Sequence, residues 1–303
     1  MKLDGFTRKI GNAEQLLKAR EIIFCGGKDN GLRAVELDNG LIRCTVLRDR
    51  CLDIADLSHR GVNIGFISKN GVVAEPYEFG RAFGGGFLHT CGLDSIGANP
   101  GHAQHGNVHF IPAESVFIDK REVSVCGTMR DTALFGQNLA LKRKISLKLG
   151  SNVLKIEDEL VNEGFTAQRY ALLYHFNLGY PFIDSGAEIE ADISSSEGAD
   201  EFAAGGLDKA LIMEEPVDGG RERVFYHDVK EGNVKIINRA LRKSVNFCYD
   251  KNMLPFLIEW KSMISGDYAL GIEPSTSQLW DRLKYRTVEA GESLKFKIEA
   301  AFK

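Results

Sequence analysis

Apolar and polar residues alternate along most of the chain after residue 30. The first clear run spans residues 31–47 and alternates on both sides of Asp38-Asn39-Gly40. Asn-Gly readily adopts the positive φ of a tight turn, so this run predicts a β-hairpin. Similar runs follow, with glycine, asparagine or aspartate turns between them, at residues 115–129, 139–164, 232–250, 256–274 and 292–302. Many strands with frequent turns predict an all-β fold, a large antiparallel β-sandwich or barrel.

The one helical pattern lies near the N-terminus. Residues 12–20 place two leucines on one face and begin with Asn12, a suitable N-cap, so they predict a short helix. We expect residues 1–30 to form a helical or extended lead-in to a single domain that spans residues 1–303. No proline-rich or Gly/Ser-rich linker divides the chain, and residues 194–210 are expected to form a loop inserted in that domain.

Composition narrows the function classes. The 303 residues are 44% hydrophobic and carry a net charge of −4, so no basic excess points to a nucleic-acid partner. The N-terminus lacks the apolar core of a signal peptide, and no 18-residue apolar run predicts a membrane span. The six cysteines are scattered without a C-x-x-C pair, which is typical of reduced thiols in a cytoplasmic protein.

Three of the seven histidines lie close together, in the segment CGLDSIGANPGHAQHGNVHF (residues 91–110). On a helix, His102, His105 and His109 would share a face, as zinc-binding histidines do. The proline and glycines of the segment disfavour a helix, and in an extended chain His102 would point away from the other two. We therefore expect no metal site but a loop at the sheet rim that feeds a strand, with His105 as its best functional candidate.

Two apolar strands carry isolated polar residues. Residues 169–181 (RYALLYHFNLGYP) place His175 and Asn177 on one strand face, close to a turn at the rim of a sheet, where functional sites collect. Glu273 ends another apolar strand just before Pro274. A carboxylate there must be paired, solvated by a cleft or shifted in its pKa.

Motifs of several other enzyme classes are absent from the sequence. It contains no G-x-S-x-G, no P-loop and no H-E-x-x-H. The segment FGGGF (residues 83–87) lacks the strand and helix of a dinucleotide site, and is expected to let backbone pass close to a ligand or a neighbouring strand. What remains is Arg81, several imidazoles and one or two carboxylates, a set that suits proton transfer on an uncharged, polar substrate such as a sugar. Trp280, and less so Trp260, is a candidate to stack on a sugar ring.

These residues occur in an order that resembles the galactose mutarotase-like (aldose 1-epimerase) superfamily, and most closely its DUF4432 family. Arg81 precedes His105-Gly106 in a GG…TCGL…HG pattern, and YHFNLGYP (174–181) and GIEP (271–274) follow. The similarity in order extends over roughly residues 30–303. It implies a large twisted β-supersandwich that interconverts the α and β anomers of aldoses without a cofactor.

The resemblance also implies an acid and a base. Glu273 would take the proton of the anomeric hydroxyl, and His175 would protonate the ring oxygen, so that the ring opens and closes from its other face. We expect Glu273 to be ionised and His175 protonated, because their mutual attraction favours that pair. In the family the acid histidine usually lies four residues before an asparagine, whereas His175 lies two before Asn177. The shift amounts to about 7 Å along a strand.

The remaining roles implied by the resemblance concern substrate binding. His105 and Arg81 would hold and orient the sugar hydroxyls, with Asn177 beside the acid. An aspartate of the family also binds hydroxyls, and Asp228, or His227 beside it, is the candidate for that role.

The sequence is compatible with three functions. The leading hypothesis is a sugar mutarotase that needs no cofactor and binds a small carbohydrate, neither nucleic acid nor a membrane, with a homodimer as an option. The alternatives are a non-catalytic carbohydrate-binding protein on the same scaffold and another sugar enzyme, such as a lyase, an epimerase at another carbon or a metal-dependent isomerase.

Overall fold

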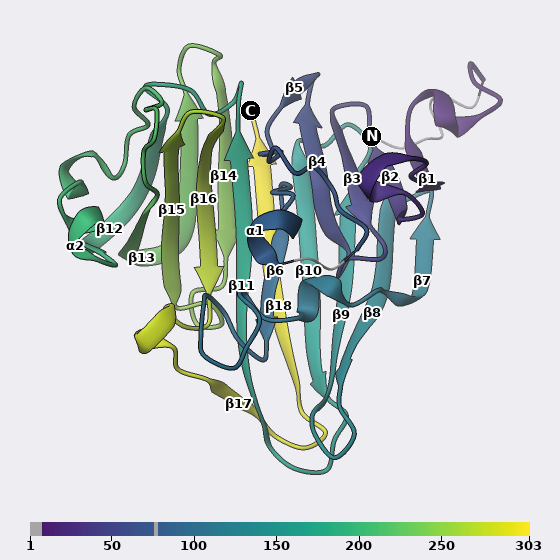
Figure 1. Cartoon of the computed structure of the whole chain (residues 1–303). Helices are drawn as coiled ribbons and strands as arrows, with labels where there is room; N and C mark the ends of the chain where they lie inside the picture. The colour runs from purple at the N-terminus through teal and green to yellow at the C-terminus, as the bar shows by residue number, and fades with distance from the viewer. Residues whose placement is uncertain (1–7, 76–77) are drawn as a thin grey trace.

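Two antiparallel sheets form the body of the protein in the computed structural model, which describes residues 8–75 and 78–303 (Figure 1). The first sheet follows chain order and contains β1 (Lys18–Ile23), β2 (Arg33–Asp38), β3 (Ile42–Leu47), β4 (Asp53–His59) and β5 (Val62–Asn63). The second is larger and contains β6 (His89–Leu93), β7 (Glu114–Asp119), β8 (Ser124–Thr132), β9 (Asn138–Leu147), β10 (Val153–Asn162), β11 (Gln168–Gly179), β12 (Glu188–Gly198), β13 (Arg223–Asn238), β14 (Lys243–Tyr249), β15 (Phe256–Ile264), β16 (Asp267–Ser275), β17 (Arg286–Val288) and β18 (Ser293–Phe302). This arrangement confirms the predicted all-β antiparallel sandwich.

Strand β11 is the centre of the large sheet. It pairs with β16 on one side and with β6 and β17 on the other, and the sheet continues from β16 through β15, β13 and β14. One face of β11 presents Tyr174 and Phe176 to the core, as the alternation predicts. The opposite face presents His175 and Asn177, so β11 itself lies between the core and these two candidate functional residues.

The main core lies between the two sheets. Its buried side chains come from the small sheet, such as Val35 and Leu37, and from the large sheet, such as Leu141 and Ile156. In Figure 1 the strands β2–β5 lie in front of β7–β10 and β18, which gives the sandwich its two layers. Burial of the apolar side of each sheet supplies the main driving force for this packing.

The local predictions had mixed outcomes. The Asn-Gly turn joins β2 to β3 as predicted, and residues 149–152 form the turn between β9 and β10. The helix expected over residues 12–20 is wrong. Only a 3₁₀ turn at Ala13–Gln15 forms, with the Asn12 side chain as its cap, and β1 begins at Lys18. Pairing with β2 buries Leu17 and Ala19, and this tertiary contact overrides the weak helix propensity of the segment.

The expected loop over residues 194–210 is also wrong in its first part. Residues 194–198 complete β12, which pairs with β13 across two register shifts. A short helix, α2 (Glu201–Ala204), and a 3₁₀ turn follow. The other α-helix, α1 (Phe79–Ala82), lies in front of β6 and β11 in Figure 1. Among the residues that the structure describes, no helix has the length and apolar character needed to cross a membrane.

Candidate active site

A cavity of about 170 Å³, here called the main cavity, brings five of the predicted residues together. They are His105, His175, Glu273, Trp280 and the weaker candidate Trp260. Its other walls come from α1 and the residue after it, the 97–104 loop, the start of β13 and the residue before it, and the segment before Trp280, with Phe79, Phe83, Gly97, Ala98, Gln104, Glu222, Val224 and Leu279. The cavity combines aromatic walls with a few convergent polar groups, as ligand sites commonly do.

Glu273 and His175 are in direct contact. Strands β11 and β16 are neighbours, with Asn177 opposite Gly271, and this register brings the two side chains to the same face. The His175 Nε2 atom lies 3.1 Å from Glu273 Oε1, and the side chains are only 6% and 2% exposed. The two-residue shift relative to the family pattern therefore still leaves His175 within reach of the carboxylate.

Burial shifts the pKa values of both partners toward their neutral forms. Removal from water raises the pKa of Glu273 well above its usual range, and the carboxylates of Glu222 and Glu259 raise it further. Burial, together with nearby His105, lowers the pKa of His175 well below its usual range. The direct contact opposes these shifts, because opposite charges attract strongly in a dry site. Burial thus favours the neutral carboxyl and imidazole, whereas the contact favours the ionised pair that the sequence suggested, and both forms carry one proton.

Both partners keep free hydrogen-bonding capacity. The 3.1 Å contact of Glu273 Oε1 with His175 Nε2 lacks the geometry of a hydrogen bond, so neither Glu273 Oε1 nor His175 Nδ1 has a hydrogen-bond partner among the described residues, although both atoms are buried. Buried polar atoms are normally satisfied, so unpaired atoms beside a cavity indicate a site for a ligand or ordered water.

Gly271 forms the floor under this pair. A Cβ atom at this position would lie 2.8 Å from Glu273 Oε1 and 3.1 Å from His175 Cε1. Both distances are tighter than ordinary van der Waals contact, so a side chain here would displace the carboxylate or the imidazole. The glycine of the GIEP motif is thus explained by the close approach of the two functional groups.

His105 enters the cavity from a strained loop. Its φ is +63°, and its backbone N–H donates to the Gly97 carbonyl over 2.8 Å. The Gly97 N–H donates to His105 Nδ1 over 3.3 Å, which leaves the proton on Nε2 and makes that nitrogen a donor. Burial lowers the pKa of His105 to about 4, so the ring is neutral near pH 7. Neutral His105 is suited to hydrogen bonding with a hydroxyl group.

Glu222 is a site residue that sequence reasoning missed. Its Oε2 atom accepts a hydrogen bond from Trp260 Nε1 over 2.7 Å, and both residues line the main cavity. The Trp260 ring also contacts His175, with ring centroids 5.6 Å apart. Glu222 lies in a charged segment before β13 and no motif marks it, whereas Trp260 was judged a weaker stacking candidate than Trp280.

Three predicted residues lie outside the main cavity. Arg81 is an exposed residue of α1, although Phe79 of the same helix and Phe83 directly after it line the cavity. Asn177 is buried and donates from Nδ2 to the Gly86 and His175 carbonyls over 3.1 Å each. Asp228 is exposed on β13 and forms an ion pair with Lys251 at 3.3 Å. Its neighbour His227 also lies away from the cavity.

The three clustered histidines diverge. His102 is exposed and lies 3.2 Å from Asp94, His105 enters the main cavity, and His109 enters a second one. No three histidine, cysteine, aspartate or glutamate side chains converge as metal ligands would within the described part of the chain. The expected strand after the loop is wrong as well, because residues 108–110 form a 3₁₀ turn and the next strand begins at residue 114.

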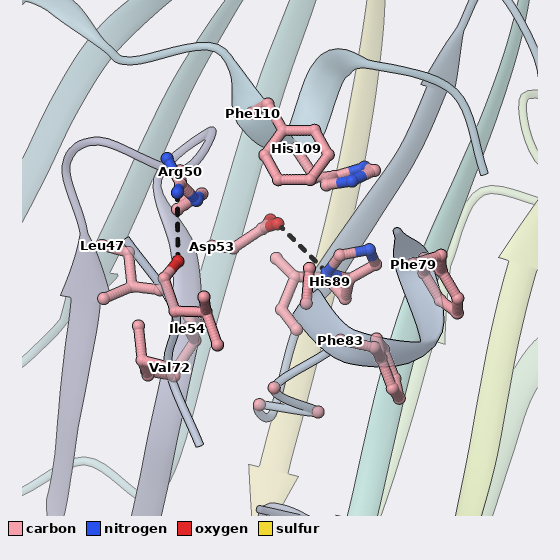
Figure 2. A pocket seen from close by; sticks show the side chains of 17 residues that line it. Leu47, Arg50, Asp53, Ile54, Val72, Phe79, Phe83, His89, His109 and Phe110 are labelled. Carbon is pink, nitrogen blue, oxygen red and sulfur yellow. Dashed lines mark hydrogen bonds and ion pairs between the residues drawn. The ribbon is translucent and has the colours of Figure 1, made fainter. Parts of the chain in front are cut away.

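The second cavity has a volume of about 50 Å³ and shares the walls Phe79 and Phe83 with the main cavity. Figure 2 shows its polar groups, with Asp53 directed toward His89 and the ring of His109 close by. The His89 and His109 ring centroids are 4.5 Å apart, and His89 Nδ1 lies 4.0 Å from Asp53 Oδ2. Sequence reasoning missed His89, because its position depends on the pairing of β6 with β11. The predicted close approach of FGGGF is confirmed here, since a Cβ atom on Gly86 would lie 2.6 Å from the Ile54 carbonyl oxygen.

Comparison with known proteins agrees with this arrangement. The sequence profile of DUF4432, a domain of unknown function, matches residues 29–301. The chain belongs to the DUF4432 family. No functionally curated protein is similar enough in sequence to count as a match.

This DUF4432 protein is also similar in fold to solved structures of other proteins. A Klebsiella pneumoniae protein described as a "putative aldose 1-epimerase" is 22% identical, with a TM-score of 0.85 over 96% of this chain and 86% of that chain. A galactose mutarotase-like protein from Clostridium acetobutylicum is 14% identical, with a TM-score of 0.70 over 95% and 99% of the two chains. The fold is therefore that of the galactose mutarotase-like proteins.

Proposed function

We propose that this DUF4432 protein is a sugar mutarotase, an isomerase that interconverts the anomers of an aldose without a cofactor. The observation that carries the proposal is the 3.1 Å contact between Glu273 Oε1 and His175 Nε2 at a buried cavity. Anomer exchange needs a base at the anomeric hydroxyl and an acid at the ring oxygen. These two oxygens are bonded to the same carbon, so the base and the acid must be close neighbours, as Glu273 and His175 are.

The proton path follows from this pairing. Glu273 takes the proton of the anomeric hydroxyl while His175 gives a proton to the ring oxygen, and the C1–O5 bond breaks to leave the open-chain aldehyde. Rotation about C1–C2 presents the other face of the aldehyde carbon. His175 then takes the proton back from the C5 hydroxyl as it attacks, and Glu273 returns a proton to the carbonyl oxygen. Each transfer contributes about 10²–10⁴-fold.

Substrate binding would fall to the cavity walls. The neutral His105 ring and the Glu222 carboxylate are placed to bind sugar hydroxyls, and Trp260 and Trp280 offer aromatic faces. Arg81 stays a candidate for substrate binding, as Phe79 of its helix and Phe83 just after it line the cavity. Asp228 lies outside the cavity, so we assign the carboxylate role to Glu222.

The test is anomer exchange measured by saturation-transfer NMR on a panel of aldoses, with wild type beside Glu273→Gln. The proposal expects accelerated exchange of at least one sugar and loss of that acceleration in the variant. If wild-type protein accelerates anomer exchange of no sugar in the panel, the proposal is overturned. Exchange that persists in Glu273→Gln would overturn the assignment of the base.

A non-catalytic carbohydrate-binding role is the second candidate. Burial favours the neutral carboxyl of Glu273 and the neutral imidazole of His175, by raising one pKa and lowering the other. Neutral groups can hydrogen-bond to hydroxyls without transferring protons. Thermal stabilisation by a sugar whose anomer exchange is not accelerated would favour this candidate.

The proposed setting of the reaction is the cytoplasm, with an uncharged carbohydrate as the ligand. All six cysteines carry free thiols, which a reducing compartment maintains. Homodimer formation stays a prediction from the sequence.

A further inference from the structure

The second cavity lies directly beside the proposed acid. In the antiparallel pairing of β6 with β11, His89 is opposite His175, so the two side chains project from the same face. Phe83 contacts both rings, with centroids 5.2 Å from His89 and 5.9 Å from His175. Phe79 and Phe83 line both cavities, so the second cavity adjoins the main cavity close to His175.

This cavity contains buried polar atoms that the protein leaves unpaired. Neither His89 Nε2 nor His109 Nδ1 has a hydrogen-bond partner in the described ranges 8–75 and 78–303. Burial lowers the pKa of His89 well below its usual range and that of His109 to about 3, so both rings are neutral. Neutral imidazoles can both accept from a hydroxyl group and donate to it.

The volume limits what the cavity can hold. A buried water needs at least about 10–15 Å³ in the same measure, so 50 Å³ accommodates about three waters or one small polar substituent, and not a second sugar ring. Asp53 also lines the cavity, and burial raises its pKa to about 6. Its carboxylate is paired with Arg143 at 3.1 Å, and Arg50 also lines the cavity, so the small volume rather than the charge favours an uncharged substituent.

The chemistry of an aldohexose indicates which substituent this is. If His175 protonates the ring oxygen, the next ring atom is C5, and in a hexopyranose C5 carries the exocyclic CH₂OH group. That group is held within two bonds of the atom that His175 contacts. Of all the sugar substituents, it is the one that must project close to the proposed acid on the side away from the anomeric hydroxyl.

We propose that the second cavity is a subsite for the exocyclic hydroxymethyl group of a neutral aldohexose, with His89 and His109 as its hydrogen-bonding partners. This inference rests on the proposed mutarotase function and adds the substrate class. It makes the protein selective for hexoses over the pentoses that lack C6 and over the corresponding 6-deoxy sugars.

The experiment compares matched sugars in matched variants. Anomer exchange is measured for D-glucose beside D-xylose and for D-galactose beside L-arabinose, pairs that differ only in the exocyclic CH₂OH group. The variants are His109→Phe and His89→Phe, which keep a planar ring and remove the nitrogens. His102→Phe is the control, because His102 is exposed and lines neither cavity. Thermal melting reports whether each variant is folded, and the partly exposed His89 site provides a second variant if His109→Phe does not fold.

Wild type and His102→Phe are expected to accelerate the hexose about 10- to 100-fold more than the pentose, and this preference should fall toward unity in His109→Phe or His89→Phe. A hexose-to-pentose ratio that stays at the wild-type value in both folded variants would overturn the subsite, as would a wild-type preference for pentoses.

Saturation-transfer difference spectra separate this inference from the proposed function. The protons on C6 should be among the most strongly saturated in wild type and should lose saturation in His109→Phe, whether or not the sugar is turned over. If no sugar exchanges faster but this C6 pattern is observed, the mutarotase function fails and the subsite stands. If the C6 protons are among the least saturated, the subsite is wrong.

Discussion

His175 Nε2 and Glu273 Oε1 lie 3.1 Å apart and share a buried site that opens on one cavity. The contact joins two neighbouring strands, β11 and β16, whose pairing fixes its geometry. Because burial opposes charge on both groups while their proximity favours it, the pair carries one proton in its working state. The reactive arrangement has that proton on the imidazole, and the resting arrangement can have it on the carboxyl.

The first prediction is a bell-shaped pH profile of kcat/KM. At low pH a second proton adds to the pair, so no base remains, and the lowered pKa of His175 places this limb below 6.5. At high pH the pair loses its only proton, so no acid remains, and the raised pKa of Glu273 places this limb well above 4.5. Anomer-exchange rates, corrected for the uncatalysed reaction, measure both limbs. A profile that is flat between about pH 4 and pH 10 contradicts the paired acid and base.

Glu273→Gln should stabilise the protein at alkaline pH. The folded-state pKa of Glu273 is raised above its unfolded value, so its favourable contribution is complete below about pH 4.5 and is lost as pH rises through the folded pKa. Glutamine carries no charge to bury. We expect the free energy of unfolding to exceed that of wild type by about 0.5–2 kcal/mol at alkaline pH, and by much less at pH 4.

Urea unfolding at pH 8 and at pH 4 measures this difference between the variant and wild type. Glu157→Gln is the control, because Glu157 is an exposed residue of β10 and should show little pH-dependent difference. A Glu273→Gln variant that is less stable than wild type at pH 8 would mean that the ionised carboxylate is stabilised by its surroundings, contrary to the pKa direction.

Gly271→Ala should abolish activity while the protein stays folded. The added methyl group would meet Glu273 Oε1 at 2.8 Å and His175 Cε1 at 3.1 Å, so it must displace one of them. A displacement of about 1 Å can reduce a rate by about 100-fold. Gly11→Ala is the matched control, as nothing lies within 4 Å of its Cβ position. Full activity in Gly271→Ala would show that the pair does not act from the observed geometry.

The sequence was sufficient for the scaffold and for the residues that strand patterns mark. The alternation of apolar and polar residues predicted the hairpins. Glu273 and His175 were recognisable as functional candidates because a polar side chain in an apolar strand is costly to bury. The contact between Glu273 and His175 could not be derived from the sequence, since it depends on which strands are neighbours in the sheet. The prediction of a helix over residues 12–20 was wrong for the same reason, because pairing with β2 decides the structure of this segment.

His89 and Glu222 carried no usable signal in the sequence. His89 differs from any other strand residue only by lying opposite His175, and this follows from the register of β6 with β11. Glu222 precedes β13 in a charged segment, and only the folded chain shows Trp260 Nε1 donating to it. Spacing predicted a common face for His105 and His109, whereas the loop places them in separate cavities.

Glu222→Gln should move the alkaline limb of the pH profile to lower pH. Burial is the main cause of the raised pKa of Glu273, and the charge of Glu222 is the next. Removal of that charge lowers the cost of ionising Glu273, so its pKa falls. We also expect KM to rise about 3- to 10-fold with a smaller change in kcat, because a hydroxyl contact made in both ground and transition states is lost. An unshifted alkaline limb together with an unchanged KM would remove Glu222 from the site.

Arg143→Met should strongly destabilise the protein, because Arg143 is fully buried between two carboxylates. Its Nη1 atom lies 3.1 Å from Asp53 Oδ1, and its Nη2 atom lies 2.7 Å from Asp158 Oδ2. Methionine fills similar space but leaves two buried carboxylates without their cation, at a cost of about 3–5 kcal/mol.

Lys144→Met is the natural control for this last prediction. Lys144 is the next residue of β9, and its ion pair with Glu122 is largely exposed, so its loss should cost only about 0–1 kcal/mol. Urea unfolding near pH 7 compares the two variants with wild type. Because Asp53 also borders the second cavity, a folded Arg143→Met protein should in addition show a weaker preference for hexoses. Equal stability losses in the two variants would mean that the buried carboxylates are neutralised by protonation rather than by Arg143.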